Sequence, residues 1–228
     1  MDWLLHFDGE YTANSDSSVT LKNGPAEAIV KVLYPAVKHR EDIGLKEHDP
    51  DKKVPYLAFY PDAQAQLRQF ITAICLNSSS VPKFEMLEDP TYLGVRIESQ
   101  SAIEEFYLSR RAISTPGTMC IYTDGFTTDA YLLHLRRPSA NAPVERYFVG
   151  DGSYLRRGDQ SILESLSKLT ACWAPADSLD VFSDDSSTSI QIAAERPPQS
   201  VRWNGLVAAA RYDKEKKLVS LKRNKGSV

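Results

Sequence analysis

The chain has 228 residues, of which 42% are hydrophobic and 25% are charged, so it is long enough to bury the core of one large domain or two small ones. Its net charge of −3 argues against a protein that coats nucleic acid in general, and any contact with RNA is expected to be local. The longest apolar runs, such as Ile71 to Leu76, are too short to cross a bilayer, and no export signal follows Met1. We expect a cytoplasmic protein with no membrane partner.

The three cysteines, Cys75, Cys120 and Cys172, are far apart and lack the spacing of metal ligands. Their odd number and wide separation predict buried free thiols in a reducing compartment.

The N-terminal part of the chain predicts a helix followed by a strand. From Pro25 to His39 apolar residues recur near helical spacing, and Gly24-Pro25 is a helix start signal. A charged segment leads into Val54 to Tyr60, which is typical of a strand ended by Pro61-Asp62. The segment from Ala63 to Leu76 fits either a helix or a strand.

Three further apolar runs favour extended chain: Lys83 to Met86, Tyr92 to Glu98 and Ala102 to Leu108. Together with the strand before them, they predict a curling antiparallel sheet.

Four segments carry a resemblance to a known family. Lys52 to Tyr60 reads KKVPYLAFY, and Phe84 to Ile97 places a tyrosine before an apolar-Gly-apolar-Arg pattern. Farther on, Tyr147 to Tyr154 reads YFVGDGSY, and Val201 to Ala210 reads VRWNGLVAAA. In this order the segments resemble the ribosome-inactivating proteins of cereals, which are RNA N-glycosylases.

The resemblance implies an α+β fold in a single domain over residues 1–228. A mixed or antiparallel sheet is expected in a sheet-rich part from about 19 to 155, followed by a mainly helical part from about 156 to 228. In the helical part, Gln160 to Trp173 and the run around Trp203 are the expected helices.

The resemblance also assigns site residues. Tyr92 and Tyr154 match the two tyrosines that stack on adenine, and Trp203 matches the tryptophan beneath the active site, which makes these three the expected substrate-binding residues. The family's catalytic helix carries Glu-x-x-Arg, and no such pair occurs between Tyr154 and Trp203. Two nearest substitutes remain. Glu164 and Lys168 are four residues apart and so share one face of a helix, whereas Glu195-Arg196 precedes Pro197-Pro198, which disfavour the interior of a helix.

The chemistry explains why that pair matters. The departing adenine needs a proton or a strong hydrogen bond from a cation, and the oxocarbenium-like sugar needs a carboxylate. We expect Glu164 and Lys168 to be the catalytic residues, with no metal and no cofactor.

The expected function is removal of an adenine from a loop of large-subunit ribosomal RNA, which would inhibit translation. Two tyrosines that hold an extruded base contribute about 1–3 kcal/mol per stacked base. Loss of a general acid costs about 10²–10⁴ in rate, whereas binding survives it. A second hypothesis is therefore a catalytically inactive relative that binds RNA or the ribosome.

A third hypothesis comes from the C-terminal half alone. Cys120 to Gly125 resembles the first strand of ribonuclease H, and Leu179 to Ser186 resembles its acidic strand. Asp124, Glu164 and Asp185 would then share Mg²⁺ and cleave a phosphodiester. Asp-Gly and Asp-Asp-Ser are also ordinary turn sequences, so a structural role for these carboxylates stays open.

The segment from Arg211 to Val228 holds seven Lys or Arg residues against two acids. It is expected either to touch RNA phosphates or to be a solvated tail.

Overall fold

The computed structural model describes residues 3–7, 9–14, 18–46, 49–61, 70–76, 81–111, 116–175, 177–185 and 187–222. All regular secondary structure in these residues is β-strand. The chain divides into two compact units, Met1–Pro82 and Lys83–Val228. Across the same residues, no helix is long and apolar enough to cross a membrane.

The N-terminal unit consists of two antiparallel sheets, in the orders β1-β6-β5 and β2-β3-β4-β7. A small core of Val19, Val32, Leu57 and Phe59 comes from strands of both sheets. The strands are β1 (Trp3–His6), β2 (Glu10–Ala13), β3 (Ser18–Asn23), β4 (Ala26–Tyr34), β5 (Val37–Lys46), β6 (Asp49–Pro61) and β7 (Ile71–Leu76).

The C-terminal unit is a single 14-stranded sheet that folds over on itself. Its main path runs β19-β18-β16-β15-β14-β13-β10-β9-β8, and β11, β12, β17, β20 and β21 lie off this path. The strands are β8 (Lys83–Glu88), β9 (Tyr92–Glu98), β10 (Ile103–Ser109), β11 (Ile121–Thr123), β12 (Phe126–Thr128), β13 (Leu132–Arg137), β14 (Arg146–Arg157), β15 (Gln160–Ala174), β16 (Ser178–Phe182), β17 (Ser189–Ala193), β18 (Ser200–Trp203), β19 (Leu206–Val207), β20 (Arg211–Asp213) and β21 (Leu218–Lys222).

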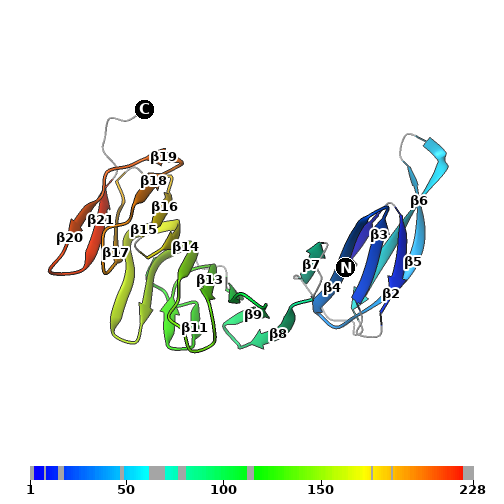
Figure 1. Ribbon diagram of the computed structural model, residues 1–228, viewed down its shortest axis with the longest axis horizontal. Helices are drawn as coiled ribbons and strands as arrows, with labels where there is room; N and C mark the ends of the chain where they lie inside the picture. Colours follow the sequence, from blue (N-terminus) through cyan, green and yellow to red (C-terminus); the bar gives the residue numbers. More distant parts are fainter. Residues whose placement is uncertain are drawn as a thin grey trace. The chain divides into compact units, whose positions relative to one another are not determined.

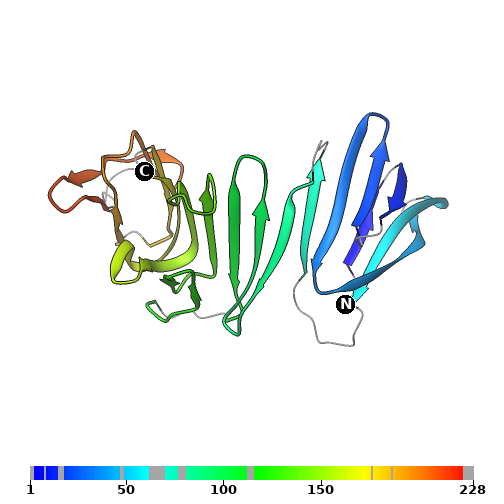
Figure 2. The same ribbon diagram turned by 60° about the horizontal axis from the view of Figure 1, so that its bottom comes forward.

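Two long strands, β14 and β15, belong to both layers of this folded sheet (Figure 1). The second half of β15 pairs with β16, whereas its first half pairs with β17, and the strand bends between them (Figure 2, yellow-green). The main core lies between the layers, where Leu163 and Ile192 of one layer and Trp173 and Val181 of the other belong to one buried cluster.

The prediction of an α+β fold with a mainly helical part is therefore wrong. Gln160 to Trp173 lies within β15, and Leu169, Ala171 and Trp173 are buried at every second position, which is the period of a strand. The expected helix from Pro25 to His39 is instead β4 and the start of β5. The helix expected around Trp203 is the hairpin β18–β19.

Turn residues explain part of this outcome. Gly24-Pro25 is the two-residue connection of the β3–β4 hairpin, and Gly24 has a φ of +58° that suits such a turn. Asp124-Gly125 and Asn204-Gly205 connect β11–β12 and β18–β19, and all four residues have positive φ, as a type I′ turn requires. Gly24-Pro25 and Asn204-Gly205 are thus hairpin turns at positions where helices were expected, whereas Asp124-Gly125 is a turn as its sequence allowed.

The predicted strands are confirmed one by one, but they do not form one sheet: β6 belongs to the N-terminal unit, whereas β8, β9 and β10 are neighbours in the sheet of the C-terminal unit. Val54 to Tyr60 lies within β6, Lys83 to Met86 within β8, and Tyr92 to Glu98 is β9. The sequence left helix or strand open for Ala63 to Leu76. Within this segment, Ile71–Leu76 is a strand, and residues 62–69 lie outside the described residues.

A bulge in β14 sits where the strand passes between the layers. The pairing of β14 with β15 shifts between Val149 and Gly152 and again between Gly152 and Tyr154. A Cβ on Gly152 would lie 2.7 Å from Val149 Cγ1 and 2.9 Å from Ala130 Cβ, so only glycine fits there. The segment from Tyr147 to Tyr154, which carries part of the family resemblance, is thus a bulged part of one strand.

The fully buried carboxylate of Asp129 satisfies the backbone that the bulge frees. Its Oδ1 accepts hydrogen bonds from the N–H groups of Ser153 at 2.7 Å and Tyr154 at 3.2 Å. Its Oδ2 accepts from the Ser153 hydroxyl at 2.6 Å and from the Gly117 N–H at 2.8 Å. Lys168 Nζ donates to the backbone carbonyls of Asp129 and Asp151 at 3.0 and 3.2 Å.

We expect Asp129→Ala to lower the free energy of unfolding of the C-terminal unit by about 3 to 5 kcal/mol, because several buried donors would lose their acceptor. Asp129→Asn keeps one acceptor oxygen and should cost less. Urea unfolding followed by tryptophan fluorescence measures both variants. A loss below about 1 kcal/mol in Asp129→Ala would contradict this role.

His134 on β13 is the titratable group whose burial makes the fold sensitive to pH. Its ring stacks on Phe106 of β10, with centroids 4.2 Å apart and an interplanar angle of 7°. Burial lowers the pKa of His134. The Glu104 carboxylate opposes this shift from 3.6 Å, a distance too long for a hydrogen bond, whereas Arg136 and Arg146 add to it.

The unfolded chain therefore binds a proton at His134 more readily than the folded protein does. As the pH falls through the ordinary histidine pKa of about 6.5, this proton binding stabilises the unfolded chain and lowers the free energy of unfolding. We expect the free energy of unfolding to fall between about pH 7.5 and about pH 5.5, and to fall less in His134→Gln. Urea titrations at both pH values test this. Phe106→Leu keeps the imidazole and should lower stability at both pH values while retaining the pH dependence. An equal fall in the wild type and His134→Gln would disprove the assignment.

Candidate functional site: an apolar groove beside the β19 edge

An open groove of about 430 Å³ lies at the end of the C-terminal unit where β19 and β20 are both edge strands. Most of the residues that line it have apolar side chains, polar atoms also face the groove, and its volume is in the range of small-ligand sites. The lining residues are Pro197, Pro198, Gln199, Ser200, Val201, Val207, Ala208, Ala210, Tyr212 and Val219.

Local sequence explains why the groove is hollow. After the Asn204-Gly205 turn and the short strand β19, the chain passes through Ala208, Ala209 and Ala210 to β20 in the other layer. Ala208 and Ala210 line the groove, and their small side chains leave the space between the two edge strands unfilled. The exposed side chain of Ala209 is not part of the lining.

Tyr212 fixes the opposite wall. Its hydroxyl donates to the backbone carbonyl of Glu195 at 2.7 Å and lies 3.3 Å from that of Ala194. The Ala194 N–H donates to the carbonyl of Lys217 at 2.8 Å, and the Lys217 ammonium lies 2.6 Å from the Glu195 carboxylate. The segment that leads to Pro197 and Pro198 is therefore held in place before any ligand binds.

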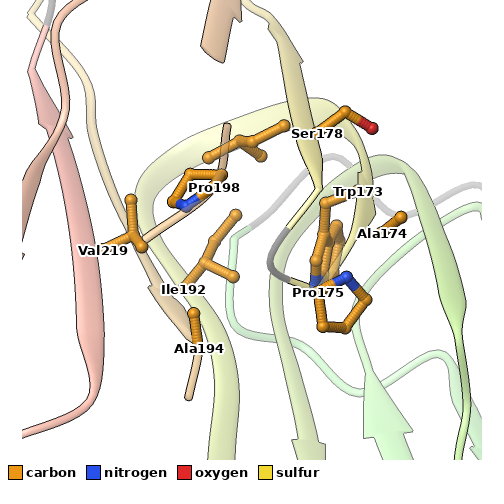
Figure 3. Close-up of a pocket in the computed structure, with 9 residues that line it drawn as sticks. Trp173, Ala174, Pro175, Ser178, Ile192, Ala194, Pro198 and Val219 are labelled. Atoms are coloured by element: carbon orange, nitrogen blue, oxygen red, sulfur yellow. The ribbon is translucent and has the colours of Figure 1, made fainter. Parts of the chain in front are cut away.

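A small cavity adjoins the groove and shares Pro198 and Val219 with it as walls. Figure 3 shows Trp173 and Pro175 on one side of this cavity, with Ile192, Pro198 and Val219 on the other. Its free volume of about 10 Å³ is enough for one water molecule.

Two tryptophans beside these hollows carry unsatisfied donors. Trp173 is 2% exposed and Trp203 is 6% exposed, and the indole Nε1 of each is buried without a hydrogen-bond partner among the residues that the structure describes. Trp173 lines the small cavity, and Trp203 lies two residues after the groove residue Val201 on β18. Buried indole N–H groups usually find an oxygen acceptor, from water or from a bound molecule.

The edge strand β19, next to the groove, exposes two apolar side chains. Leu206 is 63% exposed and Val207 is 90% exposed, and β19 ends the strand order of the sheet. Exposed apolar side chains on an uncovered sheet edge favour pairing with another extended chain.

The expected stacking tyrosines lie on different strands. Tyr92 begins β9 and packs edge-on against Tyr107, with centroids 5.2 Å apart, and it contacts the main core. Tyr154 is on β14 beyond the bulge, where β14 pairs with β12 and β15, whereas β10 and β13 separate β9 from the part of β14 before the bulge. The structure does not bring them together as two faces of one base-binding slot. Trp203 is a core residue of the C-terminal unit.

The structure also separates Glu164 from Lys168. On a strand, residues four apart are about 13 Å apart, and Lys168 bonds to backbone carbonyls instead. Glu164 faces Tyr154 across β14 and β15, and its carboxylate lies 3.2 Å from the guanidinium of Arg156. Arg156 Cζ also lies 5.3 Å from the centre of the Tyr154 ring. Sequence reasoning missed Arg156, although strand alternation from Tyr154 places it on the same face.

The three carboxylates of the nuclease hypothesis have separate partners. The Asp124 carboxylate lies 2.9 Å from the guanidinium of Arg137, and Glu164 is paired with Arg156. Hydrogen bonds from the hydroxyl and N–H of Ser187 lower the pKa of Asp185. Over the described part of the chain, no three His, Cys, Asp or Glu side chains form a group that could hold a metal ion.

Two further sequence predictions concern the cysteines and the basic C-terminal segment. All three cysteines are free thiols, as predicted. Cys120 is buried, whereas Cys75 and Cys172 are half-buried. Burial raises the thiol pKa of Cys75 and Cys172. Of the C-terminal cations, those up to Lys222 belong to the β20–β21 hairpin, and residues 223–228 lie outside the described residues.

No family model matches this chain, and no curated protein matches it.

Proposed function

We propose that the C-terminal unit is a protein-interaction module that binds an extended, apolar peptide segment in the groove beside β19. The observation that carries this proposal is the combination of a preformed groove of about 430 Å³ with an uncovered edge strand whose two side chains, Leu206 and Val207, are exposed. A peptide that pairs with β19 gains main-chain hydrogen bonds, and its alternate side chains pack against the apolar walls.

The walls suit such a ligand. Proline and alanine side chains offer apolar surface with little conformational freedom to lose on binding, and Tyr212 already has its hydroxyl satisfied. The polar side chains of the lining, Gln199 and Ser200, are available to fix the register of the peptide backbone.

Depurination of ribosomal RNA, and RNA binding without catalysis, stay predictions from the sequence resemblance. The arrangement that depurination needs is a base held between two π-faces, whereas β10 and β13 lie between the strands that carry Tyr92 and Tyr154. The groove supports peptide binding more directly, because its shape and exposed edge both fit one ligand class.

Selection from a phage-displayed library of random peptides tests the proposal. We expect apolar peptides to be enriched on the full-length protein and to bind Ala210→Trp at least about tenfold more weakly, a loss of about 1.4 kcal/mol, because an indole would fill the groove. Ala209→Trp is the matched control, since its side chain does not line the groove, and it should leave affinity unchanged.

Absence of any enriched peptide would refute the proposal. So would peptides that lose affinity equally in Ala209→Trp and Ala210→Trp, because such binding would not depend on the groove. Near-ultraviolet circular dichroism of each variant checks that the fold is retained.

A further inference from the structure

The outer face of the layer formed by β12, β14, β15, β17, β21 and β20 presents a row of polar side chains in register. Tyr154 is paired with Glu164, Glu164 with Gln191, Gln191 with Ser220, and Ser220 with Arg211. Paired residues on neighbouring strands point to the same side of a sheet. The row therefore crosses five strands, with one side chain about every 4.8 Å. We call it the outer row.

A second, shorter line of side chains flanks one end of the outer row. Tyr122 of β11 is paired with Thr127 of β12, and Thr127 with Arg156 of β14. Tyr122 is 60% exposed, and Arg156 lies over the ring of Tyr154. Two tyrosines and a guanidinium thus share the face on which the outer row begins.

Most members of the outer row have free hydrogen-bonding capacity. Gln191 and Arg211 are exposed and Ser220 is half-buried, and none of these side chains has a hydrogen bond or ion pair to another described residue. Glu164 is paired with Arg156, yet a carboxylate has four acceptor positions and keeps some of them open. The row contains a carboxylate that accepts, a guanidinium that donates, and an amide and two hydroxyls that do both.

We propose that the outer row binds a neutral, polyhydroxylated ligand, a glycan chain that lies across the strands. Hydroxyl groups both donate and accept, so they complement a carboxylate, an amide, a hydroxyl and a guanidinium in one line. The apolar face of a sugar ring packs on a tyrosine ring while its hydroxyls reach the neighbouring polar groups.

The charges of the outer row favour this ligand over RNA. Glu164 lies near the centre of the face and is matched by Arg156, which leaves Arg211 as the one unpaired cation of the row. Binding of a phosphate backbone requires several cations that replace condensed counterions. A neutral glycan has no such requirement.

Affinity gel electrophoresis of the full-length protein tests the proposal with four soluble neutral polysaccharides: an α-glucan, a β-glucan, a xylan and a galactan. At least one should retard the protein, and Tyr154→Ala and Gln191→Ala should each weaken that interaction at least tenfold. Gln160→Ala and Tyr131→Ala are matched controls, because both residues are exposed and lie outside the outer row. They should bind as the wild type does.

Two further binding measurements separate the outer row from the groove and a glycan from RNA. Ala210→Trp should bind the polysaccharide as the wild type does, which separates the outer row from the groove. A twelve-nucleotide poly(A) RNA should not bind. The proposal is overturned if no polysaccharide retards the protein, if retardation is unchanged in Tyr154→Ala and Gln191→Ala, or if only the RNA binds and does so in a salt-dependent way.

Discussion

The carboxylate of Asp129 stabilises the point at which β14 passes from one layer of the C-terminal unit to the other. A bulge must leave some backbone N–H groups without ladder partners, and buried N–H groups without partners are costly. Asp129 accepts from two of them, and Lys168 donates to the carbonyls beside the bulge. Since β14 and β15 carry the pairing of both layers, this contact stabilises the junction between them.

Both proposed sites are consequences of that two-layer arrangement. The groove lies at the end of the unit, where β19 and β20 are edges of different layers and a run of alanines connects them. The outer row lies on the surface of one layer, where five strands present side chains in register. The groove is apolar because its walls adjoin the core, whereas the outer row is polar because strand alternation turns these residues to solvent.

The sequence predicted strands best where β-branched and aromatic residues lie between turn signals, as in β6, β9 and β10. The family resemblance misled for residues 160–173, where the apolar residues fit a helical spacing as well as alternation. The neighbouring strand β14 decides between helix and strand for this segment. Leu163 pairs with Leu155, and Trp173 stacks on Tyr147 at 4.9 Å, and these contacts exist only when the segment is extended beside β14. Glu164 consequently lies beside Arg156 and not beside Lys168.

By itself the sequence determined the positions of the tight turns, because Asp124-Gly125 and Asn204-Gly205 adopt positive φ at little cost, and it determined which side chains alternate along a strand. Only the tertiary structure decided which strands are neighbours. Tyr154 and Arg211 are 57 positions apart in the chain, yet they begin and end one row across the sheet. Such rows depend on the register between distant strands, which is set by the packing of the common core and not by local sequence.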